Sequence, residues 1–526
     1  MSSTVESSTT FVHVWDTEFP AGPVDTKMHG PYQRGDRLLY EKPWIFVVSE
    51  KLREQICNHC FQSVIIAQSV NPSLEMSDDA DSVGVSEEFP VCEDLPLMDF
   101  REKGLKRCTG CAFSWYCGKS CQKTSWKSVH KHECPVFKKA LQDEELTIPL
   151  GIETVRLCLQ ALIRVKNDPN WRDPSEGFPI LPHRTFPNLM SHWEEIKVDK
   201  KEVDFIDLMS NYFHKVLKGL GDYEDLLELE SLGTIYGKIR INNMTIFGTY
   251  GDKLGVGLYL SGSAIDHACL PNACPSFSGT LINIHATESV DCFDNVRLSY
   301  LDQIYFSVPR REMLKKRYYF DCFCRACSDE NMDQRMNGIR CPGKTCSNAI
   351  LMNPYSFESD PCSGCGCVAN KVLKDQVTDL LKRGREIQAM MSEAKKTDNH
   401  PRVLDLAETL HRDLSKVFHD TNSLVISTAL QVASSADVLG QFDKAFTYFS
   451  SLRLTYPKVF PFWSFQNAEI LMKCTTRGLL VKTNQKDQRA LLIHFVEAMK
   501  IVTVCAGRDS PTFAYYKKFY DDCRES

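Results

Sequence analysis

The sequence of 526 residues lacks the hydrophobic segments of membrane and secreted proteins. No run approaches the roughly 18 consecutive apolar residues that a membrane helix requires. The first ten residues, MSSTVESSTT, contain neither the basic nor the apolar stretch of a secretory signal. We therefore expect an intracellular protein with no membrane partner. Because no basic localisation run stands out either, the nucleus and the cytoplasm are both expected locations.

A strong charge imbalance is also missing. The chain has 62 Lys and Arg against 68 Asp and Glu, a net charge of −6, which neither requires nor excludes a nucleic-acid partner. The composition, 43% hydrophobic and 25% charged, excludes collagen-like, coiled-coil-only and wholly disordered classes. The length predicts roughly two to four packed units.

Cysteine is abundant, with 23 residues. In a chain without a secretory signal, clustered pairs of cysteines favour metal ligands over disulfides, because the cytosol keeps thiols reduced. The first cluster contains eight soft ligands in four short pairs, which suit two tetrahedral zinc sites, one of them with an imidazole in place of a thiolate. The pairs are Cys57 and Cys60, Cys108 and Cys111, Cys117 and Cys121, and His130 and Cys134.

Two further cysteine groups follow. Cys322, Cys324 and Cys327 offer three thiolates, and Cys269, in a Cys-Leu-Pro-Asn turn, is the candidate for the fourth. Such a site would join segments more than fifty residues apart. Farther on, a fourth zinc site and a loop of free thiols are equally weighted alternatives for Cys341, Cys346, Cys362 and Cys365, with Cys367 left over.

Hydrophobic periodicity divides the chain into regions of different secondary structure. Strands are expected at 37–48, 239–248, 255–260, 280–286 and 296–301, helices over 153–232, and a helical region over 372–523. Residues 73–99 contain nine acidic and no basic residues and are expected to form a solvated loop. In the last region the spacing of five residues matches a tetratricopeptide (TPR) repeat: Gly440, Phe442, Ala445, Phe449 and Pro457.

The first cysteine cluster resembles the MYND zinc finger. The resemblance implies that the first and third pairs share one zinc ion and the second and fourth pairs share the other. His132 competes with His130 as a ligand, and the family spacing favours His130. The 47 residues between Cys60 and Cys108 exceed the usual length in that family, although loop-closure cost rises only logarithmically with length.

Three later segments, 255–272, 297–302 and 318–327, look like a SET domain with its post-SET cysteines. With the finger and the helical tail, the chain resembles the SET-and-MYND-domain (SMYD) family of protein-lysine methyltransferases. The implied fold is α+β: a β-rich SET domain with an inserted MYND finger, a post-SET zinc site and an all-α TPR-like C-terminal domain. The implied divisions are a disordered tail with the N-terminal part of the SET domain (1–56), the finger with its acidic insert (57–134), a helical SET insertion (135–240), the SET catalytic core (241–305), the post-SET zinc segment (306–330), a Cys-rich connector (331–370) and the TPR-like domain (371–526).

The resemblance also implies an activity and its residues. The expected reaction is methyl transfer from S-adenosylmethionine to a histone or other protein lysine, in a protein that holds three zinc ions. Tyr300 matches the catalytic tyrosine, and Tyr318 matches a second wall of the lysine channel. The implied cofactor-binding residues are Phe320, which stacks on adenine, His267 and Asp266 of the Asp-His-Ala-Cys segment, and, more loosely, Asn242 and Ser263.

Three positions depart from the family pattern. The family has a Gly-x-Gly near the chain start, whereas Gly22 and Gly30 stand apart here. Asp266 replaces an Asn, and an ionised carboxylate only accepts hydrogen bonds whereas an amide also donates them. Gly248 also replaces a common Asn. These departures support an alternative function, a catalytically weak or inactive adaptor whose finger binds a proline-rich partner peptide.

The finger segment supports a third hypothesis, direct nucleic-acid binding. Between Arg101 and Lys139, ten Lys and Arg face two acidic residues. Seven thiolates and two zinc ions reduce this excess of eight positive charges by three. The remaining basic face suits phosphates or an acidic peptide, and a solvated finger surface is the equally weighted structural alternative.

Overall fold

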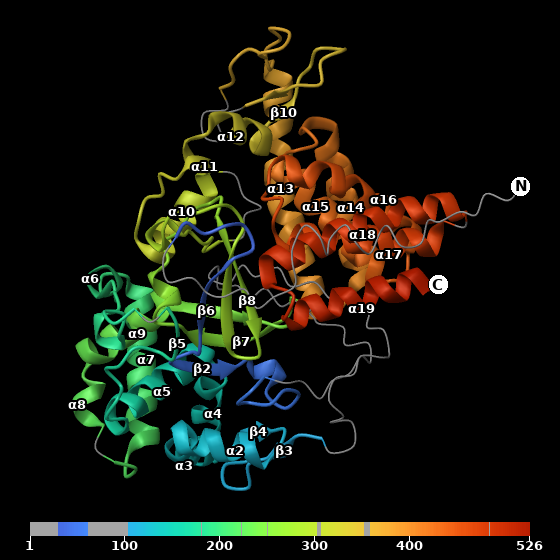
Figure 1. Ribbon diagram of the computed structural model, residues 1–526. Helices are drawn as coiled ribbons and strands as arrows, with labels where there is room; N and C mark the ends of the chain where they lie inside the picture. The colour runs from blue at the N-terminus through green and yellow to red at the C-terminus, as the bar shows by residue number, and fades with distance from the viewer. Residues whose placement is uncertain are drawn as a thin grey trace, which may run out of the picture.

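The computed structural model describes residues 30–61, 104–179, 181–221, 223–249, 251–301, 307–351, 358–482 and 484–525. The Ser/Thr-rich start, Gly22 and the acidic segment 73–99 lie outside the described residues. Figure 1 shows a mixed structure in which strands lie near the middle, the finger and the green helices lie at one end, and the orange and red C-terminal helices stack beside the strands. The expected combination of helix and sheet with a helical C-terminal region is therefore confirmed.

Two antiparallel sheets form the middle of the molecule. Their strand orders are β5-β1-β9-β8 and β2-β7-β6, and Leu39 pairs with Ile284 across β1 and β9. Both residues are fully buried in a core that the sheets share. The strands are β1 (Arg37–Glu41), β2 (Ile45–Val48), β5 (Gly177–Phe178), β6 (Asn243–Phe247), β7 (Lys253–Leu258), β8 (Ala273–Ser278) and β9 (Leu281–Ala286).

Two of the expected strands differ from the structure. Helix α9 (Leu229–Asn242) occupies the start of the strand expected at 239–248. Its buried residues Leu232, Ile235, Tyr236 and Ile239 recur at helical spacing, so one helix face is apolar and packs into the core. The segment 296–301 forms only a parallel bridge between Leu298 and His267.

The finger and the helices that follow it share one hydrophobic core. Phe113 and Phe137 of the finger are buried in the same cluster as residues of α5 and α7. The elements are η1 (Glu50–Leu52), β3 (Lys106–Arg107), β4 (Trp115–Tyr116), α2 (Lys119–Ser125), the π-helix η2 (Trp126–His130), α3 (Lys131–Ala140), α4 (Glu144–Leu150), α5 (Glu153–Asn167), η3 (Phe186–Asn188), α6 (Trp193–Ile196), α7 (Lys200–Leu217) and α8 (Glu224–Leu227).

Short elements connect the sheets to the C-terminal helices. The short helices η4 (Gly262–Ala264) and η5 (Phe293–Asn295) lie in loops that follow strands. The chain from 307 to 350 begins with a longer helix and ends in a small two-stranded sheet. Its elements are α10 (Ser307–Tyr318), α11 (Arg325–Ser328), α12 (Glu330–Asn337), β10 (Ile339–Arg340) and β11 (Ala349–Ile350).

The C-terminal helices each pack on the next helix in the sequence. At the repeat-like motif, Gly440 adopts a φ of 69° between two helices, and Ala445 and Phe449 are buried. Among the described residues, no helix is both long and apolar enough to span a membrane. The elements are α13 (Lys371–Lys396), α14 (His400–Val417), α15 (Ser423–Val438), α16 (Phe442–Thr455), η6 (Tyr456–Lys458), α17 (Phe465–Val481), α18 (Gln485–Ala506) and α19 (Pro511–Glu525).

A buried ion cluster connects α15 and α17. The Asp437 carboxylate accepts hydrogen bonds from Arg477 and lies 3.6 Å from the Lys473 ammonium. The Lys473 and Asp437 side chains are 1% and 2% exposed. Burying charges at this depth is unfavourable unless they are paired. The cluster therefore fixes how the two helices pack.

Asp437→Asn should lower the free energy of unfolding of the C-terminal helices by about 3 kcal/mol. It removes the buried carboxylate that pairs with both Lys473 and Arg477. Hydrogen exchange of the α15 and α17 amides measures this local loss. The control is Asp521→Asn, which removes a half-exposed pair with Lys517 and should change little. Equal protection in both variants would show that the cluster does not stabilise the helix packing.

Candidate active site and metal centres

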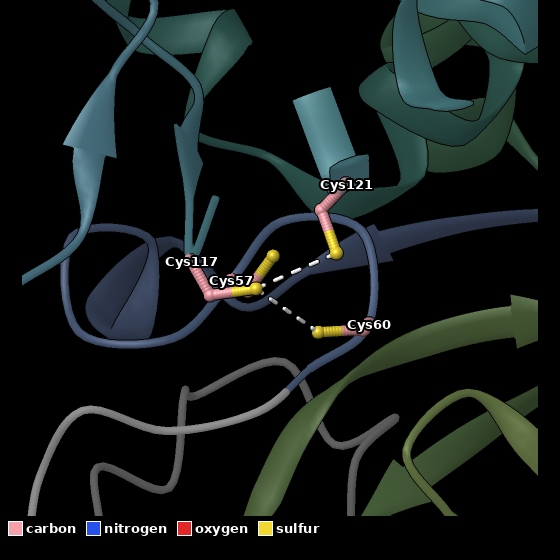
Figure 2. A group of neighbouring side chains, drawn as sticks. All are labelled: Cys57, Cys60, Cys117 and Cys121. Carbon is pink, nitrogen blue, oxygen red and sulfur yellow. Dashed lines mark hydrogen bonds between the residues drawn. The ribbon is translucent and has the colours of Figure 1, made fainter. Parts of the chain in front are cut away.

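Four sulfur atoms meet at the base of the finger. Figure 2 shows Cys57 and Cys60 from one loop facing Cys117, which follows β4, and Cys121 of α2. The Sγ atoms of Cys60 and Cys117 are 3.8 Å apart, and those of Cys117 and Cys121 are 3.4 Å apart. Tetrahedral zinc with Zn–S bonds of about 2.3 Å spaces its sulfurs about 3.8 Å apart. A hydrogen bond from Cys60 is the main cause that lowers the pKa of the Cys57 thiol to about 5. The geometry suits a four-thiolate zinc site.

A second group in the finger combines three cysteines with His130. The His130 Nε2 lies 3.4 Å from Cys108 Sγ and 3.7 Å from Cys111 Sγ, and Cys134 Sγ lies 3.9 Å from Cys108 Sγ. His130 is 1% exposed, and its Nδ1 lies 3.5 Å from the buried Glu133 carboxylate, which orients the ring.

The histidine in this group is His130 and not its competitor His132. His130 ends the π-helix η2. His132 lies two residues farther along, in α3, and outside the group. The ring of His130 also packs edge-on against Tyr116. The buried aromatic contact and the Glu133 carboxylate together fix the imidazole toward the three sulfurs.

A third group joins two segments that are far apart in the sequence. Cys269 Sγ lies 4.0 Å from Cys322 Sγ and 3.5 Å from Cys327 Sγ. The Cys269 amide also donates to the sulfur of Cys324. These four thiols form one candidate metal group. The structure therefore brings together the turn after His267 and the segment after α10, as the spacing predicts.

His267 is held by the backbone on both sides. The Asp266 carbonyl accepts from the Leu298 amide, and the Ala268 amide donates to the Leu298 carbonyl. The Tyr300 amide donates to His267 Nδ1 at 3.0 Å. A ring that accepts at Nδ1 carries its proton on Nε2, which lies 3.2 Å from Cys269 Sγ. Burial lowers the pKa of His267 to about 4, so the imidazole is neutral at neutral pH.

Aromatic side chains gather around this histidine. The His267 ring lies 5.2 Å from the Tyr300 ring and 6.0 Å from the Phe320 ring, and the Tyr300 ring lies 5.0 Å from that of Tyr318. The Tyr300 hydroxyl donates to the Ile265 carbonyl at 2.6 Å. Burial, and then the nearby Asp266 carboxylate, raise the pKa of Tyr300 above its usual value. Its phenol is therefore neutral at neutral pH.

Comparisons with known proteins found one matching family and several similar proteins. Residues 91–134 match the MYND finger family. The human N-lysine methyltransferase SMYD2 is 24% identical over 421 residues, which cover 80% of this chain and 86% of that protein. SMYD2-A from Xenopus laevis is 26% identical over 418 residues, with the same coverage. The histone-lysine N-methyltransferase ASHR1 from Arabidopsis thaliana is 23% identical over 69% of this chain and 73% of its own length.

The chain thus contains a MYND finger and is similar over most of its length to lysine methyltransferases of the SMYD type. The matched finger segment begins after Cys57 and Cys60. The structure nevertheless places these two cysteines beside Cys117 and Cys121. The long segment between Cys60 and Cys108 thus separates ligands in the sequence that meet in the fold.

The other two expected cofactor residues, Ser263 and Asn242, make hydrogen bonds within the protein. The Ser263 hydroxyl donates to the Leu260 carbonyl and accepts from Arg184. Asn242 ends α9, and its amide donates to the carbonyls of Met190 and Lys238. Both side chains therefore make internal hydrogen bonds that fix the chain nearby.

The three positions that depart from the family pattern, Asp266, Gly30 and Gly248, differ in their exposure and in the groups they contact. Asp266 is exposed, so its carboxylate is hydrated and carries no large burial cost. Gly30 lies against the backbone of Asp291, and Tyr32 next to it forms a bridge with Val290. This part of the N-terminal segment therefore runs along the loop after β9. At Gly248 an added Cβ would lie 2.5 Å from the Asp252 carboxylate, so a larger side chain would require that turn to move.

Sequence reasoning missed two residues that hold the segment before His267. The buried Glu41 carboxylate of β1 accepts from the amides of Ser261 and Gly262 at 2.9 and 2.8 Å. Burial raises the pKa of Glu41 to about 6, and the same amides oppose this effect. Arg184 donates to the Leu260 carbonyl from the other side. A single Glu at a strand end and a single Arg in a loop carry no spacing signal, so only the fold reveals them.

Glu41→Ala should lower the stability of the protein by about 2 kcal/mol, because it leaves two buried amide donors without an acceptor. It should also loosen the segment that leads to His267, because that segment loses its support, and its amides should then exchange faster. Thermal unfolding and hydrogen exchange measure the two effects. Glu176→Ala, which removes an exposed pair with Lys42, is the control. Unchanged exchange of the Ser261 and Gly262 amides in the Ala variant would contradict a positioning role for Glu41.

Proposed function

We propose that this protein transfers the methyl group of S-adenosylmethionine to the ε-amine of lysines in histones or other proteins. The observation that carries the proposal is the meeting of His267, Tyr300, Tyr318 and Phe320, which come from three separate segments. The zinc-type group at Cys269 lies directly beside them. The relatives named above are lysine methyltransferases by name, which supports the same reaction class.

The residues around His267 fit such a cofactor. The half-buried Phe320 ring offers an aromatic face to a purine. The exposed Asp266 carboxylate is an acceptor for an ammonium group, so a carboxylate in place of an amide suits a donor on the ligand. S-adenosylmethionine supplies a sulfonium methyl group that an amine can attack. The neutral His267 contributes no positive charge that would repel a sulfonium.

Tyr300 and Tyr318 form the proposed wall for the lysine side chain. Their rings lie 5.0 Å apart and are half-buried, so they exclude water and orient an aliphatic chain. A lysine amine has a pKa of about 10.4 and must lose a proton before it attacks. The raised pKa of Tyr300 argues against a phenolate base. We infer that its hydroxyl and the Ile265 carbonyl orient the amine after the proton has left to solvent.

Tyr300→Phe tests this role. It removes the hydroxyl that bonds to Ile265 but keeps the ring and the backbone amide that holds His267. Methyl transfer should fall about 100-fold, as for the loss of one preorganised hydrogen-bond donor, while S-adenosylmethionine affinity should stay within about threefold. Calorimetry and transfer of a labelled methyl group to histones measure the two quantities. Tyr448→Phe, in the helical region, is the control.

The same measurements separate the enzyme from the adaptor. Folded wild-type protein that neither binds S-adenosylmethionine nor transfers a methyl group would reject the enzyme and favour a scaffold that binds partner peptides. Binding at micromolar concentrations with transfer that depends on Tyr300 would reject the adaptor. Affinity of the finger for DNA or RNA that falls steeply with salt would instead support the nucleic-acid hypothesis.

A further inference from the structure

A fourth group of cysteines lies in the connector, away from the finger and from His267. Cys341 follows β10, and Cys346 precedes β11 by two residues. Cys362 and Cys365 come from the next loop. The Sγ atoms of Cys341 and Cys365 are 3.3 Å apart, and those of Cys346 and Cys362 are 3.6 Å apart. All four sulfurs lie within 4.8 Å of one another. The group therefore has the size of a single tetrahedral thiolate site.

The backbone at Cys362 and Cys365 repeats the turns of the finger. In the Cys-x2-Cys turns that begin at Cys57, Cys108 and Cys362, the residue after the second cysteine has a positive φ and donates its amide to the carbonyl of the first cysteine. The φ values are 59° at Phe61, 58° at Ala112 and 72° at Gly366. The corresponding N···O distances are 3.0 Å to Cys57, 2.9 Å to Cys108 and 2.8 Å to Cys362. The connector thus contains the same ligand-presenting turn as the two finger sites.

Glycines next to the sulfurs show a second similarity. Gly110 in the finger has no room for a Cβ, which would lie 2.8 Å from Cys134 Sγ. A Cβ on Gly343 would lie 3.0 Å from Cys365 Sγ and 3.4 Å from Cys341 Sγ. The Gly343 amide also donates to Cys341 Sγ at 3.4 Å. An amide that points at a sulfur stabilises a thiolate, which is the form that binds metal.

We propose that Cys341, Cys346, Cys362 and Cys365 bind a fourth zinc ion, which makes the described segments 339–351 and 358–367 a zinc ribbon. Four thiolates and no histidine favour zinc over harder cations. This ion is additional to the finger and Cys269 sites. It lies in the region at the top of Figure 1, beside β10 and α12. Two disulfides, Cys341 with Cys365 and Cys346 with Cys362, are the competing structure.

The ribbon contacts the turn between α14 and α15. Ile339 forms a bridge with Phe418, the residue after α14. The Gly338 carbonyl accepts from the amide of His419 and from the side chain of Asn422, which caps α15. On the other side of the hairpin, His419 Nε2 lies 3.0 Å from the Ser347 carbonyl. An ion that fixes the ribbon therefore also fixes the α14–α15 turn.

Native mass spectrometry of the full-length wild-type protein measures the number of bound metals without any variant. We expect a mass excess of four zinc ions per chain. Cys362→Ser/Cys365→Ser should retain three ions, whereas Cys367→Ser, a cysteine of the same loop outside the group, should retain four. Three ions in wild type, or loss of an ion in the Cys367 variant, would overturn the ligand assignment. A denatured mass lower by four hydrogens would establish the two disulfides instead.

Hydrogen exchange supplies a readout that does not depend on metal counting. In the double variant the amides of β10, β11 and His419 should exchange faster, while those of the finger and of α17 should be unchanged. If the double variant does not fold, the four-ion mass of wild-type protein and the single variant Cys365→Ser, at an exposed position, decide the proposal. Unchanged exchange at His419 in a folded variant that has lost one ion would reject the proposed bracing of the α14–α15 turn.

Discussion

Sulfur atoms that face one another in groups of three or four join parts of this chain that are far apart in the sequence. Each group requires the backbone to bring several loops within a few ångströms, and repulsion between thiolates makes that arrangement unfavourable without a cation. The strands and helices of the finger are short, and its buried aromatic residues belong to the core of the helices that follow it, so metal ligation supplements that packing. The site at Cys269 joins the turn after His267 to the segment that contains Phe320. The position of the aromatic group therefore depends on it.

Backbone hydrogen bonds also fix the position of the aromatic group formed by His267, Tyr300, Tyr318 and Phe320. Leu298 pairs with the chain on both sides of His267, and Tyr300, two residues later, donates to the imidazole. On the opposite side, Glu41 holds the amides of Ser261 and Gly262. These contacts come from β1, from the segment after η5 and from the loop around η4. A small shift of any one of them would move the residues that we propose to hold the cofactor and the lysine.

Ligand spacing is local, so the sequence alone could pair most of the cysteines that the structure brings together. A Cys-x2-Cys turn requires only four residues, whereas the choice of His130 over His132 rested on the resemblance to the MYND family. Helix and strand boundaries were less accurate at 239–248, where β-branched and aromatic residues suggested a strand although Leu232 to Ile239 carried a helical pattern. The supports at Glu41 and Arg184 could not be predicted, since their partners are backbone groups more than seventy residues away.

The Cys-x2-Cys turns that begin at Cys57, Cys108 and Cys362 have the same backbone geometry but lie opposite different segments. In the finger, the turns at Cys57 and Cys108 face residues of β4, α2 and α3 and organise a small module. At Cys362 the same turn faces a two-stranded hairpin whose outer edge contacts the α14–α15 turn. The turn geometry thus fixes the direction of its two sulfurs, and the segment that supplies the other ligands determines which parts of the chain are joined. In this chain the two finger groups hold the loops of the finger together, and the Cys269 group orders the proposed active site. The connector group would fix the hairpin of β10 and β11 against the α14–α15 turn. A loss of metal should therefore affect different functions depending on which group loses its ion.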